Sequence, residues 1–189
     1  QALEKHSDPL HKVSIIPRGP MGGATFSLPE RDRMVYTTSY LAAQLKVTLG
    51  GRVAEEIYCG EISSGASSDI QQATEIARHM VTDWGMSESV GFIHYGEDRG
   101  GMFDLGTRNY SEETAAKIDG EVKRIVDEAH TATQKMMIEY KDRGEAIAQA
   151  LLKYETLTGD DVHAIIRGET LDRPTISDIL DAEQAKPGA

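Results

Sequence analysis

The sequence contains a single cysteine, Cys59, among its 189 residues, so no disulfide can form within the chain. That usage suits a reducing compartment. No apolar run approaches the roughly 20 residues needed to cross a bilayer, and no signal-peptide pattern opens the chain. The sequence starts at Gln1 rather than at a methionine. We therefore expect a soluble piece of a longer protein, with any membrane anchor lying outside it.

Positive charge is also scarce, because 20 Lys and Arg residues stand against 31 Asp and Glu residues. The net charge of -11 argues against a nucleic-acid surface, which needs a basic stripe. Hydrophobic residues make up 39% and charged residues 27% of the chain, which is ordinary for a globular protein. The length suffices for one domain with a core.

The β-structure that we expect is confined to two short segments near the N-terminus. Val13–Ile16 and Ala24–Leu28 are rich in β-forming residues, and each is followed by a proline, Pro17 and Pro29. A glycine-rich turn separates them. The sequence therefore predicts a small β-sheet.

Helical patterns dominate the rest of the chain. A first helix shows an apolar residue at every fourth position: Leu41, Leu45, Leu49, Val53 and Ile57. Gly50 and Gly51 interrupt this stripe, which predicts close packing against another backbone. A second helix runs from about Ile70 to Trp84, with Ser68 and Gln71 at capping-box spacing.

Three further helices follow a glycine-rich loop over residues 90–109. Ser111 is placed to cap a long helix whose apolar stripe runs over Ile118–Tyr140. Shorter helices are expected around Glu145–Tyr154 and Asp160–Ile166, the last with a capping box at Thr158 and Asp161. The fold class expected is mainly α, with a small sheet near the N-terminus. We expect one domain over residues 1–166 and a flexible tail over 167–189.

The six histidines do not form a metal site that can be recognised from spacing. No two of them are four residues apart, the spacing that puts two imidazoles on one helical face. A zinc site built wholly within this chain is therefore disfavoured.

Acidic residues offer two candidates whose roles stay open on chemistry alone. Asp69 follows a loop of small residues, Ser63–Ser68, at the start of the second helix, where a carboxylate is usually a helix-start residue. Glu55 and Glu56 lie in the middle of the first helix. Adjacent helical residues diverge by about 100°, so only one of them can face the core. A solvated helix face is the default explanation for this pair.

Three separated segments, in this order, resemble a known family. They are Asp8–Gly19, with the sequence DPLHKVSIIPRG; Leu49–Glu56, with LGGRVAEE; and Ser64–Ile70, with SGASSDI. Together they resemble the peptidase domain of the FtsH family, the membrane-anchored AAA+ zinc proteases. The resemblance covers residues 1–166 and rests on several motifs in register.

The resemblance implies a zinc endopeptidase. Members use ATP and Mg²⁺ in a neighbouring AAA+ module to pull unfolded or tagged membrane and cytosolic proteins into a hexameric chamber. There a glutamate activates a zinc-bound water. That glutamate and two histidine ligands come from an H-E-x-x-H helix, and the third ligand corresponds to Asp69. The resemblance further implies the cytoplasmic face of a bacterial inner membrane, or an organellar membrane, as the location of the parent protein.

This sequence departs from the family pattern at the H-E-x-x-H helix, which should end a few residues before Gln1. We therefore expect the catalytic base upstream of Gln1 and no catalytic residue in this chain. The chain alone should be inactive and should bind zinc weakly or not at all. We expect no nucleic-acid partner, and membrane contact only through the missing N-terminal region.

Two further roles follow from the resemblance. Glu55 matches a family position once considered for the metal, and we expect it to support the metal ligands from behind or to be structural. The strand residues Ala24, Thr25, Phe26 and Ser27 offer an edge to an extended substrate. The alternative function is a non-catalytic scaffolding module of the same ring complex.

Overall fold

The computed structural model describes residues 1–17, 19, 22–28, 34–96, 110–175 and 178. The chain divides into two compact units, one formed by Gln1–Arg33 with Glu139–Ala189 and the other by Met34–Ile138. Much of the expected loop, residues 97–109, lies outside the described residues, as does most of the expected tail. Within the described part of the chain, no helix is both long and apolar enough to cross a membrane.

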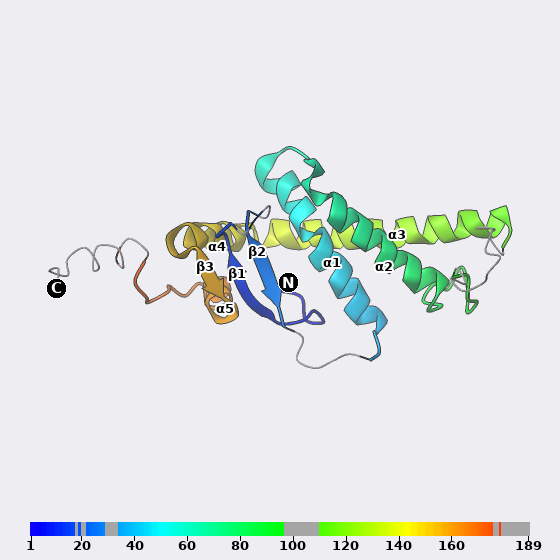
Figure 1. Cartoon of the computed structure of the whole chain (residues 1–189), viewed down its shortest axis with the longest axis horizontal. Helices are drawn as coiled ribbons and strands as arrows, with labels where there is room; N and C mark the ends of the chain where they lie inside the picture. The colour runs from blue at the N-terminus through cyan, green and yellow to red at the C-terminus, as the bar shows by residue number, and fades with distance from the viewer. Residues whose placement is uncertain (18, 20–21, 29–33, 97–109, 176–177, 179–189) are drawn as a thin grey trace. The chain divides into compact units, whose positions relative to one another are not determined.

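The Met34–Ile138 unit is built from three helices: α1 over Thr38–Ala54, α2 over Ser67–Thr82, and α3 over Glu112–Glu139. Helices α1 and α2 lie side by side (Figure 1), and their apolar faces share one core with that of α3. Leu45, Val81 and Ile118, one from each helix, are at most 1% exposed. The predicted stripe of the first helix is confirmed, because Leu41, Leu45, Leu49 and Val53 are all buried.

Helix α1 continues through its two glycines. Nothing lies within 4 Å of a Cβ atom built on Gly50, and only a side chain lies near one on Gly51. The prediction of close packing against another backbone is therefore wrong. The helix instead widens into a single π-helical turn, Glu55–Cys59, which Gly60 ends at a φ of 70°. Such turns are rare in proteins, and those that occur are often found at functional sites.

The helix starts show which capping predictions hold. The proposed box of Ser68 and Gln71 is wrong, because α2 begins earlier and its N-cap residue, Ala66, makes no side-chain cap. A short 3₁₀ turn, Ser64–Ala66, precedes α2, and the turn itself is capped by a serine. The Ser111 cap is confirmed, since its Oγ accepts the N–H of Thr114 at 3.2 Å.

The other unit contains a three-stranded antiparallel sheet in the order β2-β1-β3. Its strands are β1 over Leu10–Ser14, β2 over Ala24–Ser27, and β3 over Thr156–Thr158. Val13 pairs with Thr25 on one side and with Leu157 on the other. The two expected strands are present, although β1 begins and ends earlier than predicted. The third strand was not predicted.

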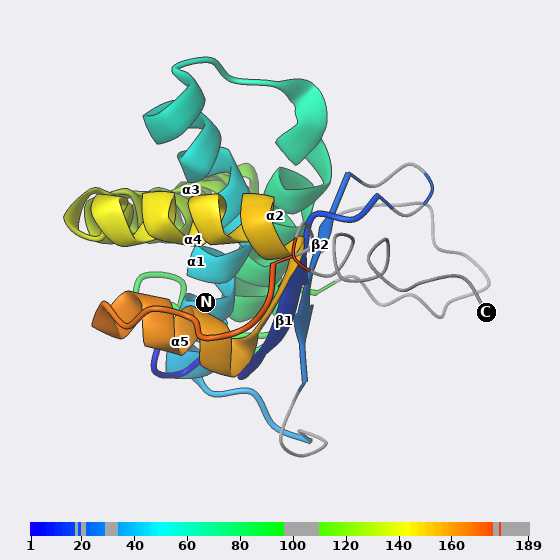
Figure 2. The same ribbon diagram turned by 90° about the vertical axis from the view of Figure 1, so that its left-hand side faces the viewer.

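Two helices complete this unit, α4 over Lys141–Tyr154 and α5 over Gly159–Arg167 (Figure 2). Leu157, Val162 and Ile165 form the centre of its core. The capping box at Thr158 and Asp161 is confirmed. A Cβ atom on Gly159 would lie 2.1 Å from the carbonyl oxygen of Leu10, so β1 can approach α5 only because this residue is a glycine. The expected fold class, mainly α with a small sheet, is confirmed.

Candidate metal-ligand site

Asp69 is the third residue of α2 and is half-buried. Its carboxylate makes no hydrogen bond or ion pair within the described part of the chain, and it does not cap the helix. The Oδ2 atom lies 3.7 Å from the position that a Cβ atom on Gly51 would occupy. The missing side chain of Gly51 thus leaves space beside this carboxylate. Zinc binds carboxylate oxygens of aspartate and glutamate, so the Asp69 side chain is of a suitable chemical type.

Glu55 binds the segment that leads to Asp69. Its Oε1 accepts the hydroxyl of Ser63 at 2.8 Å and its Oε2 accepts the N–H of Ser63 at 3.2 Å. The Ser63 Oγ in turn accepts the N–H of Gly65 at 3.0 Å. The hydrogen bonds from Ser63 lower the pKa of the Glu55 carboxyl, and the bond from the Ser63 side chain has a larger effect than the bond from its backbone. Glu55 is therefore an ionised carboxylate that accepts hydrogen bonds from the loop before α2.

Glu56 points elsewhere, as expected for adjacent helical residues. Its carboxylate lies 3.3 Å from Nε of Arg52 and 3.2 Å from Nε2 of His130 on α3. Its side chain is 21% exposed. Glu56 therefore links the π-helical turn after α1 to α3, whereas Glu55 binds the loop before α2.

The candidate substrate strand, β2, is an edge strand of the sheet, because only β1 pairs with it among the described strands. Thr25 and Ser27 are exposed, while Ala24 and Phe26 are half-buried. The strand belongs to the first unit and Asp69 to the second.

The described residues hold no group of three His, Cys, Asp or Glu side chains that could bind a metal ion. Two histidines of this unit are instead engaged with acids. His79 Nδ1 lies 2.5 Å from Oδ2 of Asp83, and His130 contacts Glu56. The contact between His79 and Asp83 was not predicted, although the two residues are four positions apart at the end of α2, a spacing that places side chains on one helical face. Asp69 thus offers a carboxylate of the kind that zinc binds, but no group of three such side chains surrounds it among the described residues.

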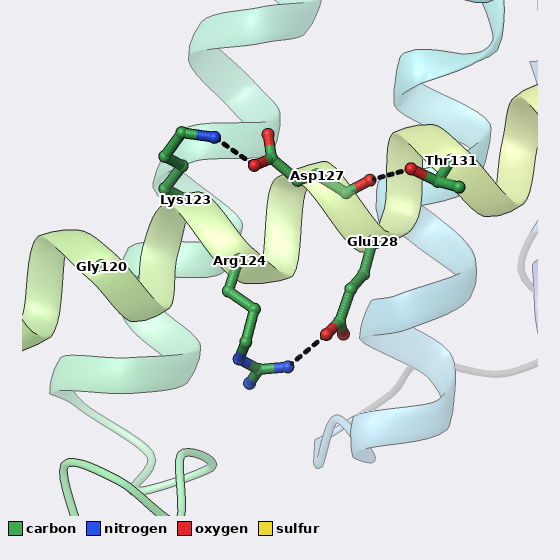
Figure 3. A pocket seen from close by; sticks show the side chains of 6 residues that line it. All are labelled: Gly120, Lys123, Arg124, Asp127, Glu128 and Thr131. Atoms are coloured by element: carbon green, nitrogen blue, oxygen red, sulfur yellow. Dashed lines mark hydrogen bonds and ion pairs between the residues drawn. The ribbon is translucent and has the colours of Figure 1, made fainter.

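A shallow hollow on the outer face of α3 is lined by side chains of that helix (Figure 3). Lys123 pairs with Asp127, and Arg124 pairs with Glu128 at 2.7 Å. Because these charges neutralise one another along a single helix, the hollow lacks the free polar groups that a substrate site requires.

Comparison with known sequences assigns the chain to a family. The sequence model of peptidase family M41 matches residues 1–165. The chain belongs to peptidase family M41. It is 48% identical over 176 residues to "ATP-dependent zinc metalloprotease FtsH 2" of Methylacidiphilum infernorum, covering 91% of this chain and 28% of that protein. It is 44% identical over 177 residues to "ATP-dependent zinc metalloprotease FtsH" of Bacillus subtilis, again covering 91% and 28%.

The M41 chain thus spans less than a third of the length of these relatives. The same holds for the FtsH of Protochlamydia amoebophila, which is 46% identical over 169 residues, with 87% of this chain and 18% of that protein covered. The resemblance drawn from the sequence motifs is confirmed at the level of the family. Asp69 and Glu55 were singled out from the sequence as candidates, whereas the bonds of Ser63 to Glu55 and the relation of Gly51 to Asp69 were not predicted.

Proposed function

We propose that this chain forms most of the peptidase domain of an ATP-dependent zinc metalloendopeptidase, in which Asp69 is the third protein ligand of the zinc. The observation that carries the proposal is the half-buried Asp69 carboxylate, which has no partner among the described residues and lies beside the gap at Gly51. A carboxylate with only a structural role at a helix start usually bonds to nearby N–H groups. Membership of family M41 and the names of the relatives support the zinc chemistry.

In this proposal the rest of the metal site comes from an H-E-x-x-H helix upstream of Gln1. Two histidines one turn apart complete the ligand set, and the glutamate between them is the general base. Zinc held there supplies a Lewis acid for the peptide carbonyl and lowers the pKa of a bound water. Asp69 contributes negative charge and one fixed oxygen to the ligand set.

The substrate role of β2 follows from its position as an edge strand. An extended peptide can add to the free edge through backbone hydrogen bonds. Thr25→Pro and Phe26→Pro test this role, because successive N–H groups alternate between the two edges of a strand. One variant removes a donor from the free edge and the other disturbs the pairing with β1. If both variants left peptide cleavage by the parent protein unchanged, β2 would have no part in substrate binding.

The parent protein, in this proposal, also contains an AAA+ module that binds ATP and Mg²⁺ and a membrane anchor. It assembles as a hexamer on the cytoplasmic face of a bacterial inner membrane or on an organellar membrane. Its substrates are unfolded or tagged proteins. The length of the relatives, more than three times that of this chain, leaves room for these parts.

Casein cleavage by the purified parent protein, with ATP and zinc present, tests the function. We expect Asp69→Asn to abolish most cleavage and Asp127→Asn, on the outer face of α3, to leave it intact. The 189-residue chain alone should be inactive. Unimpaired cleavage by the Asp69 variant would contradict the proposal. A parent without H-E-x-x-H upstream of Gln1 would instead indicate the non-catalytic scaffolding module.

A further inference from the structure

The segment between the π-helical turn and α2 is fixed mainly by hydrogen bonds. Residues 60–65 are all exposed, and the side chain of Ile62 is 63% exposed. Apolar packing resumes only at Ala66, which is 4% exposed. The two bonds from Ser63 to Glu55 therefore hold the middle of a segment that has little other support.

We propose that Glu55 and Ser63 form a tether that sets the position of Asp69 for metal binding. This inference rests on the proposed function, since it assumes that Asp69 is a zinc ligand. Neither residue is proposed to touch the metal. Glu55 holds Ser63, and Ser63 holds the backbone of Gly65 within the 3₁₀ turn that leads into α2.

The path from the tether to the ligand is short and continuous. The 3₁₀ turn Ser64–Ala66 passes directly into α2, and the N–H of Ser67 bonds to the carbonyl of Ser64. Asp69 follows two residues later, within the first helical turn. A displacement of Ser63 is therefore transmitted to the start of α2, where Asp69 lies.

The last turn of α1 and the π-helical turn that follows it support both ends of this arrangement. Gly51 and Glu55 are four residues apart, the spacing that places two residues one above the other on a helix. Gly51 leaves the space that the Asp69 carboxylate borders, and Glu55 anchors the loop that delivers it. Positioning groups of this kind typically change metal affinity or activity by about 10–100-fold when removed.

Glu56 provides a matched control for Glu55. It is the adjacent glutamate in the same turn, but its carboxylate contacts Arg52 and His130 instead of the loop. Glu56→Gln therefore removes the same charge and weakens the contacts with Arg52 and His130 without releasing Ser63. Any effect of charge or of helix stability should appear in both variants.

The experiment compares Glu55→Gln, Ser63→Ala, their double variant, Ser63→Thr and Glu56→Gln in the intact parent protein. Zinc affinity is measured by competition with a chelator, peptide cleavage is resolved into kcat and KM, and thermal unfolding is followed in parallel. We expect Glu55→Gln and Ser63→Ala each to weaken zinc affinity about 10-fold and to lower kcat with KM unchanged. The double variant should cost less than the sum of the two single variants, because both weaken the same hydrogen-bonded contact between Glu55 and Ser63.

The conservative variant and the control separate positioning from a general loss of structure. Ser63→Thr keeps the hydroxyl and should retain zinc affinity. Glu56→Gln should lower the thermal midpoint without changing zinc affinity. Wild-type zinc affinity and kcat in Ser63→Ala, or equal zinc loss in Glu56→Gln, would overturn the tether. If the wild-type parent bound no zinc, the proposed function itself would fall instead.

Discussion

The Oδ2 atom of Asp69 lies 3.7 Å from the point where a Cβ atom on Gly51 would stand. That distance is an ordinary van der Waals contact, so a methyl group at residue 51 would touch the carboxylate without a clash. Gly50, the preceding residue in α1, faces no heavy atom within 4 Å. The two glycines therefore offer a comparison in which only one borders the candidate metal ligand.

Valine at residue 51 should impair zinc binding, whereas valine at residue 50 should not. Two γ-carbons fill two of the three staggered positions around Cβ, so a Gly51→Val side chain crowds the Asp69 carboxylate. Helix propensity changes equally in Gly50→Val, which serves as the control. Zinc bound per subunit of the purified parent protein measures the effect. Equal zinc content in both variants would show that the space beside Asp69 is not needed.

Glu121 should stabilise the fold at neutral pH and lose that effect in acid. Its carboxylate accepts two hydrogen bonds from Arg124, at 3.0 and 2.9 Å, and one from the buried Ser87 hydroxyl at 2.7 Å. These bonds, those of Arg124 first, lower the pKa of Glu121 to about 2. Because the folded pKa lies below the ordinary value of 4.5, the contribution is complete above about pH 5 and disappears as the pH falls towards 2.

Urea unfolding of the 189-residue chain at pH 7 and at pH 3 tests this dependence. Glu121→Gln should lower the free energy of unfolding by about 1–2 kcal/mol at pH 7 and by less at pH 3. Glu113→Gln is the control, because the Glu113 side chain is 79% exposed and pairs with Lys117 at the surface. That change should leave the free energy of unfolding close to that of the wild type, because solvent screens an exposed pair of this kind. A deficit in Glu121→Gln that did not shrink in acid would contradict the account.

Alanine at residue 159 should destabilise the unit that contains the three-stranded sheet. A Cβ atom there would lie 2.1 Å from the Leu10 carbonyl oxygen, and this backbone atom cannot move without disturbing β1. We expect Gly159→Ala to cost about 2 kcal/mol or more. Gly120→Ala should instead stabilise the chain by up to about 1 kcal/mol, because Gly120 lies within α3 and faces open space. Thermal unfolding of both variants measures the difference, and equal midpoints would show that β1 can yield.

The features predicted correctly from the sequence are those that local patterns control. The stripe from Leu41 to Val53 is buried because a helical period places these residues on one face. The box at Thr158 and Asp161 forms because both residues bond to backbone only three positions away. Family motifs, rather than local chemistry, singled out Asp69.

The features missed depend on contacts between distant residues. Strand β3 has only three residues, and its hydroxyl contact between Thr156 and Ser14 joins residues 142 positions apart. No local pattern shows such a strand. Gly51 was interpreted as a site of backbone packing because a sequence cannot show which side chain fills the gap. Ser63 looked like one small loop residue among several until its bonds to Glu55 were visible.

The central claim is that Asp69 is a zinc ligand, and zinc content tests it most directly. The purified parent protein should contain about one zinc per subunit, as expected for a catalytic site with three protein ligands and a water. Asp69→Ala should lose zinc to a chelator far more readily, by more than the roughly 10–100-fold typical of supporting residues, while Asp127→Ala behaves as wild type. An Asp69→Ala protein that kept its zinc as tightly as wild type would contradict the account.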